Sequence, residues 1–366
     1  MKRKITVFLP SLGYGGAEVI TLRLIKGFIQ NGLDVDLVIA TPRLKMIHAI
    51  HPEVNIIKLG SRKATFSLFK LMRYIRKNKP EIILSHLNRA NRIVLLAKYL
   101  TRSPVKVFVV EHTTGSVAKS QSTLIHNIFT SFSYRFLYKY AEEIIHVSNG
   151  AARDLEDLLG WEPGRIKVVY NPVVDDGSSE KSYSIPHPWF NPEQPPVIVS
   201  MGRICAPKDY VTLIKAVDIV RKTREVRLLI LGDGRERKKI EDLIQEYGLI
   251  NNVQIMGIVD DPFPYLFHAD LFVLSSTREA LPTVIIEALS CGCPVVSTEC
   301  KYGPSEILND GIFGKLVPVG NSNAMAIAII HSLDNIPDRS TLRNRANEFS
   351  IQKSTDLYIR ILGLKN

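Results

Sequence analysis

Two glutamates, Glu279 and Glu287, lie on either side of a predicted helix start in the segment 275–296, which reads SSTREALPTVIIEALSCGCPVV. Pro282 favours that start, because proline is preferred at the first helical position, where its missing N–H costs nothing. The free N–H groups of a first helical turn and the positive end of the helix dipole suit a phosphate. Glu287, further along the helix, could accept hydrogen bonds from a vicinal diol such as ribose. The segment therefore predicts contacts with a nucleoside diphosphate and, through Glu279, with the group attached to it.

An ordinary amphipathic helix would explain the same residues. Thr283, Glu287 and Ser290 recur at helical spacing and could form a polar stripe on an exposed face. Features of the rest of the sequence distinguish between the two interpretations.

Length and composition predict a soluble protein of two domains. A chain of 366 residues exceeds one typical core, and 45% hydrophobic with 23% charged residues is ordinary for a globular protein. The four cysteines include no C-x-x-C pair, which favours a reducing cytoplasm. No apolar run reaches the roughly 18 residues of a membrane-spanning helix. The start, MKRKITVFLP, resembles a signal peptide, but its apolar stretch ends at Pro10, so we expect a first strand there.

Basic residues are concentrated in the first half of the chain. Residues 1–175 contain 26 Lys and Arg against 13 Asp and Glu, whereas residues 176–366 contain 21 against 23. This asymmetry predicts an anionic partner for the first half only. Nucleic acid, an acidic membrane surface and a phosphorylated substrate all qualify.

Apolar strands alternate with helical patterns, which argues for parallel sheets. The pattern stops in a Pro- and Ser-rich segment, 175–196, which we interpret as a linker, and then starts again. Two doubly wound, Rossmann-like α/β domains facing a cleft are therefore expected. The predicted strands are 5–9, 35–40, 82–85, 105–110, 143–147, 167–170, 197–201, 227–231, 253–256, 271–274 and 294–297.

Glycines and cations follow several predicted strands, at the edge where open parallel sheets bind ligands. The loop 11–16 follows the first strand; it could hold a phosphate or simply be a tight turn, but it is not the G-x-G-x-x-G of a dehydrogenase. Arg203 and Lys208 follow the strand 197–201 and suit a diphosphate, although both could be ordinary surface cations.

Together these residues resemble the retaining glycosyltransferases of family 4, which have the GT-B fold. The resemblance extends over nearly the whole chain, and the stretch GPSEIL at 303–308 is similar to a branch that acts in bacterial surface-glycan assembly. The motifs that carry it are Gly13–Gly16, Gly202-Arg203 with Lys208, Gly232-Asp-Gly234, Gly257, the E-x7-E of Glu279 and Glu287, and CGCPVV.

The resemblance implies two domains with different ligands. Residues 1–175 would bind the acceptor, with 348–366 packing back on them, and residues 193–347 would bind the nucleotide-sugar donor. Arg203 and Lys208 would stabilise the leaving UDP, Glu287 would bind the ribose and Glu279 the transferred sugar. The other implied contacts are Gly15, Gly16, Gly202, Gly232, Ile258, Leu281, Pro282, Thr283 and Val284 for the donor, and His112 near the sugar.

Such an enzyme retains configuration because the acceptor hydroxyl attacks the face from which UDP departs. It needs no enzyme nucleophile, no metal and no cofactor beyond the UDP-sugar. Asp34-Val-Asp36 reads as D-x-D, but it opens a strand, and the alternation predicts two exposed side chains. Ala280 stands where the family commonly has glycine, and Cys205-Ala-Pro207 is an unusual sequence before Lys208.

Two helical stretches predict a membrane contact. In 65–77, Phe66, Phe69, Met72 and Ile75 share one helical face with basic residues around it, and 122–140 is unusually apolar. Either stretch could rest on the anionic cytoplasmic leaflet, making the protein peripheral on the inner face of the cytoplasmic membrane. The alternative is that both are core helices with charged outer faces.

The predicted activity is transfer of a hexose or N-acetylhexosamine, GalNAc or GlcNAc, from a UDP-sugar to a lipid-diphosphate-linked glycan. The product would belong to a bacterial surface polysaccharide, lipopolysaccharide or glycoprotein glycan. A sugar-nucleotide epimerase, a phosphorylase or a non-catalytic sugar-nucleotide sensor could share this domain plan. A nucleic-acid partner is not expected, because the basic charge lies on one half of the chain and the paired glutamates on the other.

Overall fold

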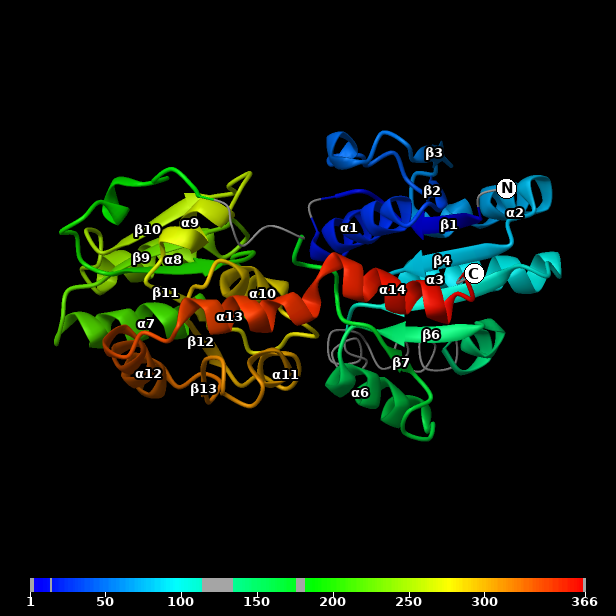
Figure 1. Ribbon diagram of the computed structural model, residues 1–366. Helices are drawn as coiled ribbons and strands as arrows, with labels where there is room; N and C mark the ends of the chain where they lie inside the picture. Colours follow the sequence, from blue (N-terminus) through cyan, green and yellow to red (C-terminus); the bar gives the residue numbers. More distant parts are fainter. Residues whose placement is uncertain (1–2, 14, 114–133, 176–181, 365–366) are drawn as a thin grey trace. The chain divides into compact units, whose positions relative to one another are not determined.

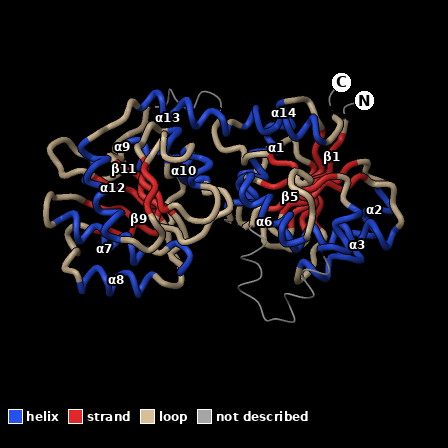
Figure 2. The backbone as a smooth tube through the Cα atoms, turned by 90° about the horizontal axis from the view of Figure 1, so that it is seen from below, coloured by secondary structure: helices blue, strands red, loops and turns tan. Residues whose placement is uncertain are grey.

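The computed structural model describes residues 3–13, 15–113, 134–175 and 182–364 (Figure 1). The chain divides into two compact units, Met1–Val173 with Ile351–Asn366, and Val174–Ser350. Each unit is a doubly wound parallel sheet with helices on both faces, as Figure 2 shows. The expected α/β fold with two Rossmann-like domains is thus confirmed.

The first unit contains a seven-stranded sheet in the order β3-β2-β1-β4-β5-β6-β7, with every pair parallel. The inner strands are continuous apolar runs, as expected for strands buried on both faces. The strands are β1 Lys4–Leu9, β2 Asp34–Ile39, β3 Asn55–Lys58, β4 Ile82–His86, β5 Lys106–Glu111, β6 Glu143–His146 and β7 Lys167–Val168.

The helices of the first unit include one from the end of the chain. Phe28 of α1 and Tyr358 of α14 meet edge to face, with ring centroids 6.3 Å apart. A Cβ on Gly27 would lie 2.1 Å from Thr355 Oγ1, so glycine allows the two helices to approach (Figure 1). The helices are α1 Gly16–Gln30, α2 Leu68–Asn78, α3 Asn88–Thr101, α6 Asn149–Leu159 and α14 Ile351–Ile361, with 3-10 turns η1 Ile47–Ala49, η2 Ala64–Ser67 and η3 Tyr138–Tyr140.

The second unit contains a six-stranded parallel sheet in the order β10-β9-β8-β11-β12-β13. Its core lies between this sheet and its helices, with Leu213, Val217 and Ile329 fully buried. The strands are β8 Val197–Met201, β9 Arg227–Leu231, β10 Val253–Gly257, β11 Leu271–Leu274, β12 Val295–Thr298 and β13 Lys315–Val317. The helices are α7 Tyr210–Arg221, α8 Arg237–Glu246, α9 Phe263–His268, α10 Thr283–Ser290, α11 Pro304–Leu308, α12 Ser322–Asp334 and α13 Arg339–Ala346, with 3-10 turns η5 Pro188–Phe190, η6 Ala206–Lys208 and η7 Asn347–Phe349.

The segment expected to be a linker packs on the second unit through two of its described aromatic residues. The Tyr183 ring lies 5.5 Å from that of Phe267, and the carbonyl of Tyr183 is 3.0 Å from His268 Nε2. The guanidinium of Arg227 lies over the ring of Trp189, 5.0 Å from the ring centroid. Aromatic contacts thus hold this irregular chain on α9 and β9, which local periodicity could not reveal.

Three further expectations are wrong in detail. Asp36 is buried rather than exposed, because Lys4 Nζ (2.9 Å) and Asn55 Nδ2 (2.8 Å) bind its carboxylate. Pro282 is the residue before α10, with an extended backbone, rather than its first helical residue. Glu287 and Ser290 are buried, so they do not belong to an exposed polar stripe.

No helix in the described parts of the chain is long and apolar enough to cross a membrane.

Candidate functional site

Three glycines end three neighbouring strands of the second sheet. Gly202, Gly232 and Gly257 stand at the carboxyl ends of β8, β9 and β10. A Cβ on Gly232 would lie 2.0 Å from the carbonyl oxygen of Gly202. The missing side chains therefore bring the backbones of these strand ends together and leave the edge of the sheet open to a ligand.

The loop after β8 is locked to the loop after β9. The amide of Ile204 donates to the carbonyl of Asp233 at 3.0 Å, and the amide of Glu236 donates to the carbonyl of Ile204 at 3.2 Å. A Cβ on Gly234 would lie 2.1 Å from the carbonyl oxygen of Ile204. The loop that carries Arg203 and Lys208 is thus fixed by backbone contacts that require glycine at position 234.

Lys208 and Glu279 form the central ion pair of the second unit's carboxyl edge. The two residues follow β8 and β11, which are neighbours where the strand order reverses, and Lys208 Nζ lies 2.6 Å from Glu279 Oε1. The side chains are 20% and 16% exposed. Ser276 Oγ donates to the same carboxylate oxygen at 2.7 Å, so both predicted residues are held in place while remaining accessible.

The backbone around Lys208 is held by the neighbouring strand. Ser275 Oγ donates to the carbonyl of Lys208 at 2.7 Å, and the amide of Thr277 donates to the carbonyl of Pro207 at 2.8 Å. Asp209 caps α7 through its carboxylate, which accepts from Thr212, and this explains its left-handed backbone at φ 43°. Gly202 lies directly against the Lys208 stem, since a Cβ there would be 3.1 Å from Cε.

The start of α10 is open to an anion. No side chain caps this helix, and the first amides of an α-helix have no acceptor within it. Leu281 and Pro282 pack against Gly303, whose φ of 92° and whose closeness to Pro282 Cδ exclude a side chain. Thr283 and Val284 begin the helix, and Glu287 is buried further in at 9% exposure.

Two predicted residues reach solvent at the same edge. Arg203 is exposed and forms no ion pair with any described residue, so its guanidinium is available to an anion. Ile258 is 73% exposed and follows Gly257, whose φ is 77°.

Three predicted site residues, Gly15, Gly16 and His112, lie in the first unit. His112 follows β5, and its Nε2 is 3.0 Å from Nδ1 of His86 at the end of β4. His86 Nε2 is buried without a partner among the described residues, so we assign the shared proton to His86 Nδ1, since a buried orphan N–H is the costlier alternative. The proton of His112 is then on Nδ1. Burial and the nearby His146 lower the pKa of His112 to about 3, so its ring is neutral at physiological pH.

Gly15 and Gly16 stand at the start of α1, where an anion is already present. Gly15 is the residue before the helix, and a Cβ on it would lie 2.2 Å from Glu18 Oε2. The Glu18 carboxylate thus lies over the glycine loop, where its negative charge interacts favourably with the positive end of the dipole of α1. This arrangement supports the tight-turn interpretation of the loop as far as it is described.

The sequence analysis missed a buried acid that adjoins His112. Glu111 is 1% exposed at the end of β5 and accepts hydrogen bonds from Tyr138 and, at 2.8 Å, from Asn91. Burial raises its pKa to about 7, and these hydrogen bonds offset part of the rise. Its position at the end of a predicted strand was a usable signal, but its partners lie far apart in sequence.

Replacing Glu111 with glutamine should flatten the pH dependence of stability. A folded pKa of about 7 against an ordinary 4.5 means that the contribution of Glu111 to stability is fully present below pH 4.5 and is lost as the pH rises towards 7. The loss is at most roughly 3 kcal/mol. Urea unfolding at pH 5 and pH 8 should therefore show Glu111→Gln gaining on the wild type at pH 8. Exposed Glu81→Gln is the control, and equal shifts for both variants would contradict the prediction.

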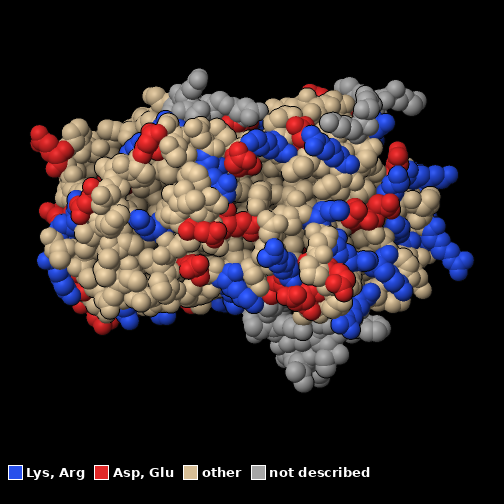
Figure 3. Space-filling view, turned by 60° about the horizontal axis from the view of Figure 1, so that its bottom comes forward, with Lys and Arg blue, Asp and Glu red and all other residues tan. Residues whose placement is uncertain are grey.

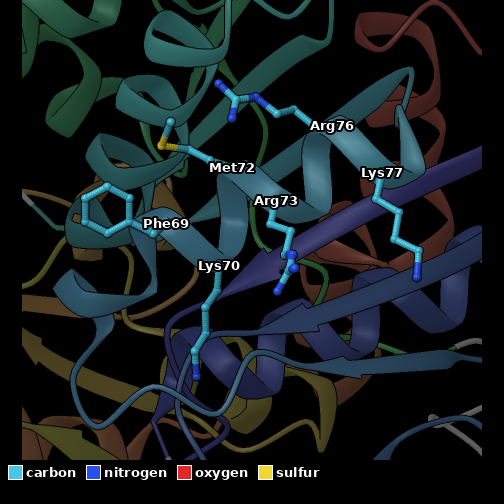
Figure 4. A pocket seen from close by; sticks show the side chains of 6 residues that line it. All are labelled: Phe69, Lys70, Met72, Arg73, Arg76 and Lys77. Atoms are coloured by element: carbon cyan, nitrogen blue, oxygen red, sulfur yellow. The ribbon is translucent and has the colours of Figure 1, made fainter.

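Helix α2 and the 3-10 turn η2 before it carry exposed aromatic and basic side chains. Phe66 and Phe69 are 64% and 78% exposed, whereas Ile75 is buried, so the four apolar residues expected on one face divide between surface and core. Lys70, Arg73, Arg76 and Lys77 surround a shallow recess of about 590 Å³ beside Phe69 and Met72 (Figure 4). Lys and Arg side chains are numerous on the first unit in the face drawn in Figure 3. Of the second stretch, 122–140, residues 122–133 lie outside the described residues.

Two family models match successive parts of the chain. Residues 14–176 match the model described as Glycosyltransferase Family 4, and residues 184–349 match the model described as Glycosyl transferases group 1. The two doubly wound domains and the open carboxyl edge of the second sheet are those of a GT-B enzyme. The chain belongs to the family 4 glycosyltransferases, which confirms the resemblance found in the sequence.

Characterised relatives cover most of the chain. One, from Campylobacter jejuni, is an N-acetylgalactosamine-N,N'-diacetylbacillosaminyl-diphospho-undecaprenol 4-alpha-N-acetylgalactosaminyltransferase, 28% identical over 94% of each chain. Another is the lipopolysaccharide core biosynthesis glycosyltransferase LpsE of Rhizobium meliloti, 33% identical over 64% of this chain and 67% of the relative.

Solved structures share the fold along the whole chain. HepE from Anabaena, crystallised with UDP, is 19% identical with a TM-score of 0.78, covering 99% of this chain and 100% of that one. The lipopolysaccharide outer core galactosyltransferase WaaB in its apo form is 18% identical with a TM-score of 0.77, covering 100% of both chains.

Proposed function

We propose that this protein is a retaining glycosyltransferase that moves a hexose or N-acetylhexosamine from a UDP-sugar to a lipid-diphosphate-linked glycan. The Lys208–Glu279 pair, placed after neighbouring strands and next to an uncapped helix, carries the proposal. GalNAc and GlcNAc are the favoured donor sugars. The names of the Campylobacter and Rhizobium relatives support assembly of bacterial surface glycans, and the first of them supports an acceptor linked through a diphosphate.

The ion pair gives Lys208 and Glu279 distinct roles. In the free protein each neutralises the other at 2.6 Å. When the donor binds, its diphosphate takes Lys208 and Arg203, and Glu279 turns to the hydroxyls of the transferred sugar. Negative charge grows on the diphosphate as the sugar leaves, so fixed cations stabilise the transition state more than the ground state.

The other contacts with the donor come from residues at the same carboxyl edge of the second sheet. The amides of Thr283 and Val284 meet the diphosphate, and the buried Glu287 accepts hydrogen bonds from the ribose diol. The main chain of Ile258 meets the base, and the backbone at Leu281 and Pro282 borders the sugar. His112, neutral and protonated on Nδ1, donates a hydrogen bond to the sugar rather than acting as a base.

Retention follows from attack on the face that UDP leaves. The acceptor oxygen forms the new bond to the anomeric carbon as the bond to the diphosphate breaks, and a donor phosphate oxygen takes the proton. Arg203 and Lys208 supply the positive charge, so we propose that neither a metal nor an enzyme nucleophile takes part.

UDP release from a panel of UDP- and GDP-sugars tests the nucleotide site. We expect slow hydrolysis of one UDP-sugar by the wild type, and a KM at least about tenfold higher in Glu287→Ala because charged hydrogen bonds to the ribose are lost. Glu246→Ala, at an exposed position of α8, should behave as the wild type. Transfer to an acceptor distinguishes this function from an epimerase, a phosphorylase or a sensor. If no UDP-sugar is cleaved and UDP gives no thermal stabilisation, the proposal is wrong.

The same protein is proposed to bind the inner face of the cytoplasmic membrane through η2 and α2. The exposed Phe66 of η2 and Phe69 of α2, together with the four cations of α2, suit an anionic leaflet. In a flotation assay, the wild type should rise with phosphatidylglycerol vesicles at low salt, and Phe66→Ser/Phe69→Ser should rise less. Ile250→Ser/Ile336→Ser, which removes two exposed apolar side chains from the second unit, is the control. No flotation of the wild type would contradict this part of the proposal.

A further inference from the structure

A basic cavity lies in the first unit, and none of the residues that line it is assigned to the donor above. Its volume is about 560 Å³. The polar side chains that line it are Ser11, Thr41, Arg43, Arg62, Lys63 and Arg89. Four of these six are cations.

The cavity lies over the carboxyl ends of four neighbouring strands. Ser11 follows β1, Thr41 and Arg43 follow β2, Arg62 and Lys63 follow β3, and Arg89 follows β4 at the start of α3. In the sheet these strands are adjacent, in the order β3-β2-β1-β4. The order reverses between β1 and β4, and open parallel sheets bind their ligands at such a reversal, outside the carboxyl ends.

The walls of the cavity are tied to one another by two backbone hydrogen bonds and one side-chain hydrogen bond. The amide of Leu12 donates to the carbonyl of Arg43 at 2.9 Å, which fixes the loop after β1 to the loop after β2. The amide of Ser61 donates to the carbonyl of Ala40 at 2.9 Å, and Thr41 Oγ1 donates to the carbonyl of Pro10 at 3.0 Å. Segments that are distant in sequence therefore hold the cations near one another before any ligand binds.

The four cations are left without anionic partners. Within the described parts of the chain, the side chains of Arg43, Arg62, Lys63 and Arg89 form no ion pair and no hydrogen bond. Cations gathered in one cavity repel one another, which costs stability unless an anion joins them. An isolated solvated arginine would need no such explanation, but four around one cavity call for a ligand.

We infer that this cavity binds the diphosphate of the lipid-linked acceptor. The inference rests on the proposed function, and it places the acceptor diphosphate in the first unit, whereas the donor diphosphate belongs to the second. A diphosphate is a multiply charged anion, and arginines bind phosphate oxygens through paired N–H groups. The hydroxyls of Ser11 and Thr41 add neutral donors.

Pyrophosphate binding tests the site directly. Calorimetry on the whole protein, with UDP present to occupy the donor site, should detect binding of inorganic pyrophosphate. Arg43→Gln/Arg89→Gln should weaken that binding at least about tenfold, since each charged hydrogen bond lost is significant. The control is Arg102→Gln/Lys106→Gln, which removes the same charge from exposed positions at the opposite ends of α3 and β5. No pyrophosphate binding to the wild type, or equal binding by both variants, overturns the inference.

Turnover distinguishes the acceptor diphosphate from a lipid headgroup. With an alkyl-diphosphate-linked sugar as acceptor, Arg43→Gln/Arg89→Gln should raise the acceptor KM about tenfold or more and leave donor KM and UDP-sugar hydrolysis unchanged. With a neutral alkyl glycoside as acceptor, the variant and wild type should match. If the variant loses only flotation on phosphatidylglycerol vesicles, the cavity is a headgroup site and the inference is wrong. A failure of the proposed function looks different, because the wild type would then neither bind UDP nor cleave a UDP-sugar.

Discussion

Replacing Lys208 with alanine should lower kcat for sugar transfer by about 10²–10³-fold, the usual effect of removing one preorganised group that stabilises a transition-state charge. Lys208 Nζ is the partner of the Glu279 carboxylate at 2.6 Å. Its removal leaves that carboxylate unpaired beside the growing negative charge of the leaving diphosphate. The fall in kcat is therefore larger than the loss of the attraction between Lys208 and the diphosphate alone would cause. The donor KM should change less, because the charge develops only as the bond to the sugar breaks.

The measurement is a kinetic comparison with a matched lysine. Lys238 forms an ion pair with Asp242, also at 2.6 Å, but lies 80% exposed on α8. Lys238→Ala removes a similar contact from the same unit and should keep the wild-type kcat. Thermal unfolding of both variants checks that the second unit remains folded. An unchanged kcat in Lys208→Ala would exclude Lys208 from catalysis, and a fall that accompanies unfolding would assign it to stability.

The central strands could be predicted because burial on both faces makes them apolar throughout. The predicted bounds of β8, β9 and β11 agree with the observed bounds at both ends of each strand. Two strands, β3 and β13, were missed. Both are short edge strands with mixed burial, so their composition differs little from that of a loop.

Candidate residues were found where a local pattern carries the chemistry. Glu279, Pro282 and Glu287 fall in one segment, and Lys208 follows a clear strand. The structure adds what sequence distance hides: Lys208 meets Glu279 across 71 positions of the chain. The cavity of Arg43, Arg62 and Arg89 could not be predicted for the same reason, because only the strand order brings these arginines together. Asp36 was misjudged because two of its partners, Asn55 and Tyr74, come from other elements.

Gly234→Ala should destabilise the second unit by about 1–3 kcal/mol, as overpacking in a tight contact does. The added Cβ would lie 2.1 Å from the carbonyl oxygen of Ile204 and 2.8 Å from both its carbonyl carbon and its amide nitrogen. These are backbone atoms, so no side-chain rotation relieves the clash and the loop after β8 has to move. That loop holds Arg203 and Lys208 against the donor. A misplacement of about 1 Å there should reduce kcat/KM by about 100-fold.

Calorimetric unfolding and kcat/KM, measured on the same preparation, separate the two effects. Glu236→Ala is the control. Glu236 lies two positions after Gly234 in the loop between β9 and α8, and its half-buried side chain has no hydrogen bond with the described residues. It should leave both quantities close to those of the wild type. If Gly234→Ala is destabilised but keeps full activity on its folded fraction, the loop after β8 does not position the catalytic cations. If it is neither destabilised nor slower, the close contact of Gly234 with Ile204 does not constrain the loop after β8, and other contacts, such as those of Ser275 and Thr277, position Arg203 and Lys208.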